Sequence, residues 1–457
     1  MAQGPSLVWF RNDLRLADNP ALDAAVQAGG PLLLVYVLDE VTPGCRPLGA
    51  AQRWWLHHSL GALARDIEGL GGTLILRQGL GPETISELAD EYGVSGVFWN
   101  RRYGLARESD ATLKDSLRAQ GLTAESFAGN LLFEPWTIRT GEGNPFKVFT
   151  PFWRACLASE PPRAPLPAPT QLTSVPDVPS DDLDSWNLLP TSPDWSGGLR
   201  DMWEPGEAGA HRRLEGFINT TLASYHRRDE PGPVTTSRLS PHLRFGEISP
   251  HIMWAALDRS LPAEAEKNKA KFLSEVGWRE FSYNILFHFP ELDQKNFRPE
   301  FDHFPWGAPN PTELKAWQQG RTGVPLVDAG MRELWHTGYM HNRVRMVVAS
   351  FLIKNMLVDW RIGEAWFWDT LVDADEANNP ASWQWVAGSG ADAAPYFRVF
   401  NPMLQAEKFD PQQEYISRWI PEIDTPDYPA APIVDLKASR DRALAAFDEL
   451  KASRQAP

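Results

Sequence analysis

The chain has 457 residues, with 43% hydrophobic and 23% charged residues and a net charge of −15. This length exceeds one ordinary hydrophobic core, so two or three domains are expected. An acidic chain cannot bind nucleic acid over its whole surface, because phosphate contacts come from Lys and Arg. Two cysteines exclude a disulfide framework or a zinc cage, and they favour a reducing, cytoplasmic compartment. Neither a signal peptide nor a transmembrane segment is predicted.

The first 133 residues predict a parallel α/β sheet of Rossmann-like type. Apolar runs predict buried strands over residues 6–10, 31–38, 73–76, 96–99 and 125–127. Helical spacing predicts helices over residues 17–28, 52–70, 82–92 and 108–120. Strands that alternate with helices in this way pair in parallel. The turn over 11–15 has no Gly-rich phosphate loop, which disfavours NAD or ATP binding.

Residues 134–206 are predicted to link this domain to a second one. Ten of the 39 prolines fall in 161–205, and proline at this density prevents regular helices and strands. From 207 to 457 the apolar spacing is mostly helical, so an all-α C-terminal domain is expected. Its clearest helical patterns cover residues 211–225, 269–289, 327–336 and 344–359, with a short amphipathic helix after 435.

Residues 235–241 place hydroxyls and one Arg at the predicted start of a helix. Free backbone N–H groups and a guanidinium there would bind a phosphate. The alternative is a helix N-cap beside a surface Arg.

Asp373 and Asp375 stand two residues apart and precede Asn378 and Asn379. The two carboxylates could hold a metal, do acid/base work, or bond ribose hydroxyls and flavin ring N–H groups. The alternative is a polar loop with Asx turns. Too few acidic residues lie nearby for a calcium loop, and no metal is predicted.

Residues 341–346 begin an apolar helix inside a locally basic region. Residues 320–361 hold six Lys or Arg against three Asp or Glu, as a DNA groove in an acidic protein would require. The alternative is a solvated helix start, with Arg345 in an internal ion pair.

The chain also has 20 Trp. Trp278 lies between Glu275 and Arg279, which are four apart and share a helix face, so a surface ion pair is the simplest interpretation. Trp383 and Trp385 are two apart and must face different neighbours. Core packing is the default role for each Trp.

Taken in chain order, these motifs resemble the photolyase and cryptochrome flavoproteins, and within them the class I-type cyclobutane pyrimidine dimer photolyases of bacteria. The resemblance runs from about residue 5 to 425, and its strings are 9–15, 236–240, 278–281, 341–346, 373–379, 383–385 and 391–398. The family fold is an α/β domain, a long linker and a helical FAD domain. The resemblance implies light-dependent repair, in which excited FADH⁻ donates an electron to a flipped-out dimer and the cyclobutane ring splits.

The resemblance also implies site residues. The FAD phosphates would lie on Thr236, Ser237, Arg238, Leu239 and Ser240, near Tyr225. Asp373 and Asp375 would contact the ring and sugar part, with Arg345 paired to one of them. Arg279 is a further cofactor-side residue, and Asn379 would face flavin N5, as in a repair enzyme. Trp383, Trp360 and Trp306 match the family's electron-transfer chain from flavin to surface.

For the substrate, the resemblance implies a pocket for a flipped dimer. It would be built from Glu275, Trp278, Asn342, Met346 and Trp385, with the two Trp stacking on bases. Arg228, Arg343 and Arg398 would meet DNA phosphates. Asn342 and Met346 stand where (6-4) photolyases carry His, so that activity is not expected.

Four positions depart from the family pattern. Phe272 and Tyr339 replace Trp in the flavin pocket of well-known bacterial members. Ala106 and Arg107 replace an Asn-Glu pair that holds a folate antenna in some members. A methenyltetrahydrofolate held differently, a deazaflavin, or no antenna at all therefore remain open. A monomer is expected, and the alternative function is a cryptochrome-type photoreceptor without repair.

Overall fold

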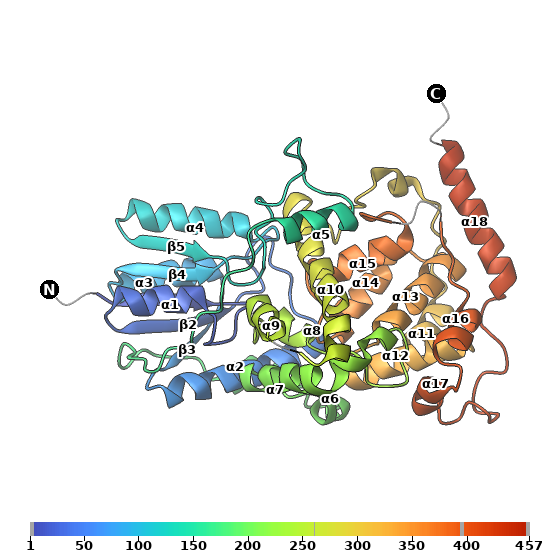
Figure 1. The fold of residues 1–457 in the computed structure, drawn as a ribbon, viewed down its shortest axis with the longest axis horizontal. Coiled ribbons are helices and arrows are strands. Elements are labelled where there is room, and N and C mark those ends of the chain that lie inside the picture. The colour runs from blue at the N-terminus through green and yellow to red at the C-terminus, as the bar shows by residue number, and fades with distance from the viewer. Residues whose placement is uncertain (1–3, 260, 394–396, 454–457) are drawn as a thin grey trace.

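The computed structural model describes residues 4–259, 261–393 and 397–453. Figure 1 shows a sheet with its helices at the N-terminal end and a mass of helices at the other end, which confirms the predicted fold class. All strand pairs in the sheet are parallel, and the strand order is β3-β2-β1-β4-β5. The strands are β1 Ser6–Phe10, β2 Leu32–Leu38, β3 Leu74–Gln78, β4 Gly96–Asn100 and β5 Thr123–Phe127.

Helices cover both faces of the sheet because successive strand side chains point to opposite faces. Val8 and Phe10 pack in a core with α1 and α2, whereas Leu7 and Trp9 pack in another with α3 and α4. The bounds are α1 Pro20–Ala28, α2 Ala50–Gly69, α3 Gly81–Glu91 and α4 Arg107–Ala119. Because both faces of the sheet are buried, the sequences of the central strands are continuous apolar runs.

Several predicted boundaries in this half are shifted by one to three residues, and two of these shifts have clear local reasons. The first helix begins at Pro20 rather than 17, because the Asn19 side chain caps it by accepting a hydrogen bond from the Leu22 N–H (3.2 Å). Strand β5 begins two residues before its predicted start. It is an edge strand with exposed Thr123 and Glu125, so no apolar run marked its beginning.

The Pro-rich segment lies against the sheet. It holds little regular structure, as predicted, yet Leu172, Trp186 and Trp203 are buried in the same core as α1 and α2. Ser174 also forms an isolated bridge with Leu32 beside β2. The helices around and within the segment are α5 Phe149–Ala158, the 3-10 helix η1 Leu183–Trp186, and α6 Gly197–Met202.

The C-terminal half is helical throughout. Its first elements are α7 Glu207–Gly216, η2 Phe217–Thr221, η3 Leu222–Arg227, α8 Ser240–Arg244, α9 Pro250–Leu257, α10 Ala263–His288, η4 Pro299–His303 and α11 Pro311–Gln318. The remainder are α12 Pro325–Thr337, α13 Asn342–Ser350, η5 Phe351–Asn355, α14 Trp360–Thr370, α15 Asn378–Ala387, α16 Pro402–Phe409, α17 Glu414–Trp419 and α18 Leu436–Ser453. Two predicted helices, over 211–225 and 344–359, are interrupted by the π-helical turns η2 and η5.

The opening motif joins the two halves. The Arg15 side chain is fully buried and donates hydrogen bonds to the carbonyls of Asp18 (2.8 Å), Gly129 (2.6 Å) and Gly246 (2.9 Å). The three carbonyls come from the first loop, the segment after β5, and the turn after α8. These bonds replace the water that the buried guanidinium loses. Arg15 therefore has a structural role between the halves.

Glu280 makes a second junction. This buried side chain on α10 accepts hydrogen bonds from the N–H groups of Leu132 (2.9 Å) and Phe133 (3.1 Å). Burial raises the pKa of Glu280 to about 7, although the neighbouring Arg279 opposes the shift. No helix in the described ranges is long and apolar enough to cross a membrane.

Candidate functional site

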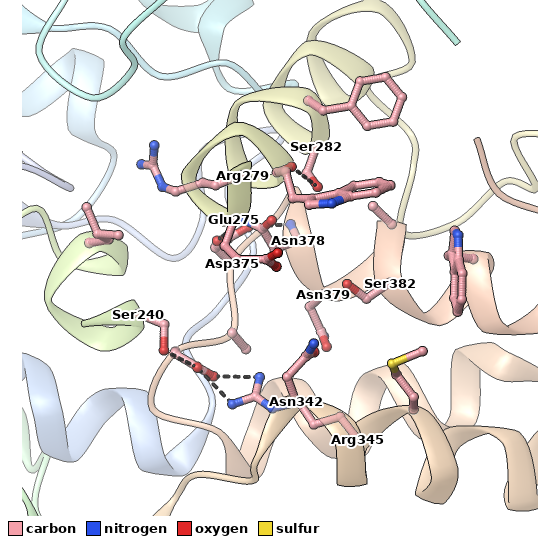
Figure 2. Close-up of a pocket in the computed structure, with 18 of the residues that line it drawn as sticks. Ser240, Glu275, Arg279, Ser282, Asn342, Arg345, Asp375, Asn378, Asn379 and Ser382 are labelled. Atoms are coloured by element: carbon pink, nitrogen blue, oxygen red, sulfur yellow. Dashed lines mark hydrogen bonds and ion pairs between the residues drawn. The ribbon is translucent and has the colours of Figure 1, made fainter. Parts of the chain in front are cut away.

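A cavity of about 560 Å³ opens in the helical half. Its walls come from α8, α10, α13 and α15, together with the loops before α13 and α15. Figure 2 shows side chains from these elements turned toward one hollow, among them Ser240, Asn342 and Asn379. Residues far apart in the sequence thus meet in one place, as the motifs predicted.

Asp373 is a fully bonded carboxylate in this cavity, held by two side chains. It is buried and accepts hydrogen bonds from both terminal nitrogens of Arg345 (3.1 and 2.8 Å) and from the Ser240 hydroxyl (2.6 Å). Burial alone would lower the pKa of Arg345, but the Asp373 carboxylate outweighs it and raises that pKa. The predicted ion pair of Arg345 is therefore confirmed, and its partner is Asp373.

Asp375 also lines the cavity, and it shapes the chain around it. Its carboxylate accepts hydrogen bonds from the N–H groups of Ala377 (2.8 Å) and Asn378 (2.5 Å), and from the Asn378 side chain (2.7 Å). This is the Asx turn of the alternative interpretation, combined with a place in the cavity wall. In the described parts of the chain, no cluster of three metal-ligating side chains exists.

Asn379 is held by a contact that the sequence did not reveal. Its side-chain N–H₂ donates to the carbonyl (3.1 Å) and the carboxylate (2.8 Å) of Glu364 on α14. Arg46, from the α/β half, in turn donates two hydrogen bonds to Glu364 (2.7 and 2.9 Å). With its nitrogen engaged in this way, Asn379 has its side-chain oxygen left for the cavity. No local pattern marks Glu364 or Arg46, which lie 318 residues apart.

The hydroxyl-rich segment is only partly at the cavity. Ser237, Leu239 and Ser240 line it, whereas Thr236 and Arg238 do not. Helix α8 begins at Ser240 without any side-chain cap, so the N-cap alternative is wrong. Arg238 adopts a left-handed backbone (φ 52°), and its guanidinium lies 5.9 Å from the Tyr339 ring.

Helix α10 forms a long wall with aromatic and charged side chains. The Trp278 ring stacks on Phe149 at 3.8 Å and 10°. The surface ion pair expected between Glu275 and Arg279 is wrong. Arg279 instead pairs with Glu280 (3.3 Å) and donates to the Asn130 carbonyl (2.8 Å). It thus turns toward the α/β half, as Figure 2 shows, although it also lines the cavity.

Glu275 has two cationic partners. The Arg228 guanidinium lies 3.2 Å from its Oε1 atom and the Lys271 ammonium 3.4 Å. Arg228 comes from the end of η3, whereas Lys271 stands one turn before Glu275 on α10. Lys271 was not predicted as a site residue, although its spacing of four residues from Glu275 on a helix could have indicated it.

Helix α13 contributes the facing wall. Asn342, Arg343 and Met346 line the cavity, as does Trp385 from α15, so all five predicted lesion-side residues share it. Arg343 pairs with Asp229 (3.0 Å) and lies over the Phe409 ring (4.4 Å). Phe272 and Tyr339, the two departures expected in the flavin pocket, are aromatic residues of the cavity wall.

The three predicted electron-transfer tryptophans belong to one hydrophobic cluster. Trp383 lines the cavity and is buried. Trp360 is fully buried, and its N–H donates to Asn296 (2.9 Å). Trp306 is half-buried and packs on Phe304 at 4.3 Å. The cluster therefore continues from the cavity wall to a partly exposed ring.

Arg398 lies outside the cavity lining. It is exposed, with its guanidinium 4.7 Å from the Phe400 ring. Residues 394–396 of the same motif lie outside the described residues. Of the three predicted phosphate-binding arginines, Arg228 and Arg343 therefore stand at the cavity and Arg398 does not.

The chain matches two family models and several known proteins. Residues 6–170 match the family model "DNA photolyase", and residues 272–427 match "FAD binding domain of DNA photolyase". A deoxyribodipyrimidine photo-lyase of Agrobacterium fabrum is 49% identical over 98% of both chains. The crystal structure of a bacterial class III photolyase from Agrobacterium tumefaciens superposes with a TM-score of 0.93, at 48% identity, over 99% of this chain and 98% of that one. Cryptochrome-1 of Arabidopsis thaliana is 39% identical over 92% of this chain, which spans 63% of that relative.

Proposed function

Because the chain belongs to the DNA photolyase family, we propose that it repairs cyclobutane pyrimidine dimers in DNA, using light and a bound FAD. One observation carries the proposal. All five side chains predicted to hold a flipped dimer line one cavity, together with the side chains predicted to hold FAD except Thr236 and Arg238. A shared cavity brings cofactor and substrate into contact, as direct electron transfer between them requires.

The donor set of the cavity fits FAD. Ser237 offers a hydroxyl donor to a phosphate, whereas the Ser240 hydroxyl already donates to Asp373 (2.6 Å). The Asp373 and Asp375 carboxylates can accept from ribose hydroxyls and ring N–H groups. The Asn379 oxygen would face the ring system. When bound and reduced, FAD supplies the excited-state electron that opens the cyclobutane ring. The protein contributes binding, orientation and the exclusion of water.

The dimer side is built for stacking and edge recognition. Trp278 and Trp385 would stack on the flipped bases, and Glu275 and Asn342 would hydrogen-bond their edges, with Met346 in van der Waals contact. Arg228 and Arg343 would bind the flanking phosphates. Arg398, which is exposed away from the cavity lining, would contact DNA only farther from the lesion.

The cluster of Trp383, Trp360 and Trp306 supports a route for electrons between the cavity and the surface. Their burial keeps the rings fixed and dry up to the last one. This route would reduce oxidised cofactor, and repair itself would not need it.

Several finer points stay predictions. The similarity to a class III photolyase favours that class over the class I type that the sequence suggested. Arg107 donates to the Phe287 carbonyl (2.6 Å), so a folate antenna would need other partners. A monomer is expected, and a DNA substrate favours a cytoplasmic location.

Illumination of purified protein with a dimer-containing oligonucleotide tests the function. Absorption should show a flavin, and reduced protein should restore intact thymines in blue light but not in the dark. Full flavin content without repair would favour the alternative, a cryptochrome-type photoreceptor. A protein that contains no flavin and cannot be reconstituted with FAD would contradict both.

A further inference from the structure

Glu275 stands at the cavity with one carboxylate oxygen covered and the other open. Oε1 is buried and is the closest approach of both Arg228 (3.2 Å) and Lys271 (3.4 Å). These contacts are charge pairs, because their geometry falls short of a hydrogen bond at Oε1. In the described structure Oε2 accepts no hydrogen bond and is accessible, so it is the oxygen of this cavity-lining residue that can meet a ligand.

The surroundings of Glu275 make these cations necessary. Its neighbours on α10, Phe272 and Val276, are buried apolar side chains that also line the cavity. A carboxylate in an apolar wall is costly without a nearby positive charge. A single ion pair with Arg228 would not suffice for Glu275, because Arg228 is also expected to bind a DNA phosphate and would then leave the carboxylate.

Lys271 supplies a second positive charge beside Glu275 that does not depend on Arg228. It stands four residues before Glu275 on the same helix, so the helix itself keeps the ammonium beside the carboxylate. The Lys271 side chain is half-exposed (49%), so solvent weakens its attraction for Glu275.

We propose that Lys271 is a positioning residue for dimer recognition: it holds Glu275 by Oε1 so that Oε2 points to the flipped bases, even when Arg228 turns to a phosphate. This inference rests on the proposed function. It assigns Lys271 a role in discrimination between damaged and undamaged DNA, beyond its charge. Lys271 would act through Glu275 and would not itself touch the reacting bonds.

Binding in the dark to matched oligonucleotides, with and without one dimer, tests the role. Lys271→Met should weaken binding to dimer DNA about three- to fivefold, the upper part of the range for a partly exposed ion pair, and leave binding to undamaged DNA almost unchanged. Lys271→Arg should restore most of the preference. Lys267→Met, which removes an exposed lysine one turn earlier on α10 and outside the cavity lining, is the matched control and should change neither affinity.

A double-mutant cycle isolates the route of the effect. In a Glu275→Gln background, Lys271→Met should have no further effect on the preference. If Lys271→Met instead weakens both DNAs equally, and lowers both salt slopes by about 0.9, Lys271 is a phosphate contact and the inference is wrong. It is also wrong if Lys271→Met behaves like Lys267→Met. A wild-type protein with no preference for the dimer would overturn the proposed function together with it.

Discussion

The inner part of the cavity and its mouth are built differently. Asp373 on the inner side is buried and accepts three hydrogen bonds of 2.6–3.1 Å. Glu275 at the mouth is half-buried and has two charge pairs of 3.2 and 3.4 Å. Fixed, dry bonds suit a cofactor that stays bound, because orientation is established before binding. Weak, solvated pairs suit a substrate that arrives and leaves, because they exchange at little cost.

The largest expected effect comes from the inner part. Asp373→Ala should remove most of the flavin, since it deletes the buried carboxylate and leaves the partly buried Arg345 without its partner. Breaking such a pair costs about 3–5 kcal/mol, which corresponds to roughly a 150- to 5000-fold loss in affinity. FAD released per chain after denaturation measures it, with surface Asp441→Ala as control. Stoichiometric FAD in Asp373→Ala would show that the inner side is not the flavin site.

Trp383→Phe tests whether the inner wall also conducts electrons. It should abolish photoreduction of the oxidised protein, because it removes the first indole next to the cavity. Repair by protein that is already reduced chemically should be retained. Trp366→Phe, which changes another tryptophan of the helical half, is the control. Photoreduction of Trp383→Phe at the wild-type rate would remove this cluster from the electron route.

At the mouth, Trp278→Ala should lose the preference for dimer DNA. Base stacking on an aromatic ring contributes about 1–3 kcal/mol per base, or roughly 5- to 150-fold in affinity. Binding to undamaged DNA should hardly change. Trp278→Phe keeps a ring against Phe149 and should retain part of the preference. An unchanged preference in Trp278→Ala would place the lesion pocket elsewhere.

Glu280→Gln probes the junction behind both parts. The folded pKa of Glu280, about 7, lies above the ordinary value of 4.5, so the folded chain holds the proton more tightly than the unfolded chain. The associated stability is therefore complete below about pH 4.5 and is lost as the pH rises through about 7. A Gln at this position is neutral at every pH, so the variant avoids this loss. Relative to the wild type, its free energy of unfolding should gain at most about 3 kcal/mol at high pH. Urea unfolding at pH 5 and pH 8 should show the variant gaining on the wild type only at pH 8. An equal difference at both pH values would contradict the shifted pKa.

The smallest effect should come from Arg343→Ala. Loss of one phosphate contact should lower the slope of log affinity against log salt by about 0.9, for damaged and undamaged duplex alike. Titrations between low and moderate salt measure the slope. Arg440→Ala, on the exposed face of α18, should leave it unchanged. A loss confined to dimer DNA would mean that Arg343 reads the lesion rather than the backbone.

The sequence predicted the parts of this molecule that repeat or run along one element. Apolar runs predicted the buried strands, and the resemblance supplied the cavity residues. The sequence could not predict contacts between residues that are distant in the chain, such as Arg228 with Glu275 or Arg46 with Glu364. Arg279 shows the same limit: its helix position is evident, but only the neighbouring Glu280 and Asn130 determine where its guanidinium points. The predicted strand at β5 was two residues too short, because the exposed residues of an edge strand do not form an apolar run.

The burial of Arg15 affects how the protein folds during its synthesis on the ribosome. Its side chain is satisfied only when the Gly246 carbonyl is in place, 231 residues later in the chain. At about 5–20 residues per second, synthesis of that interval takes roughly 12–46 s. Throughout this time the Arg15 guanidinium of the nascent α/β half lacks its Gly246 partner, because that residue has not yet been synthesised. The N-terminal half should therefore complete its packing only after α8 has emerged, and a chain truncated before α8 should be exposed to proteases there.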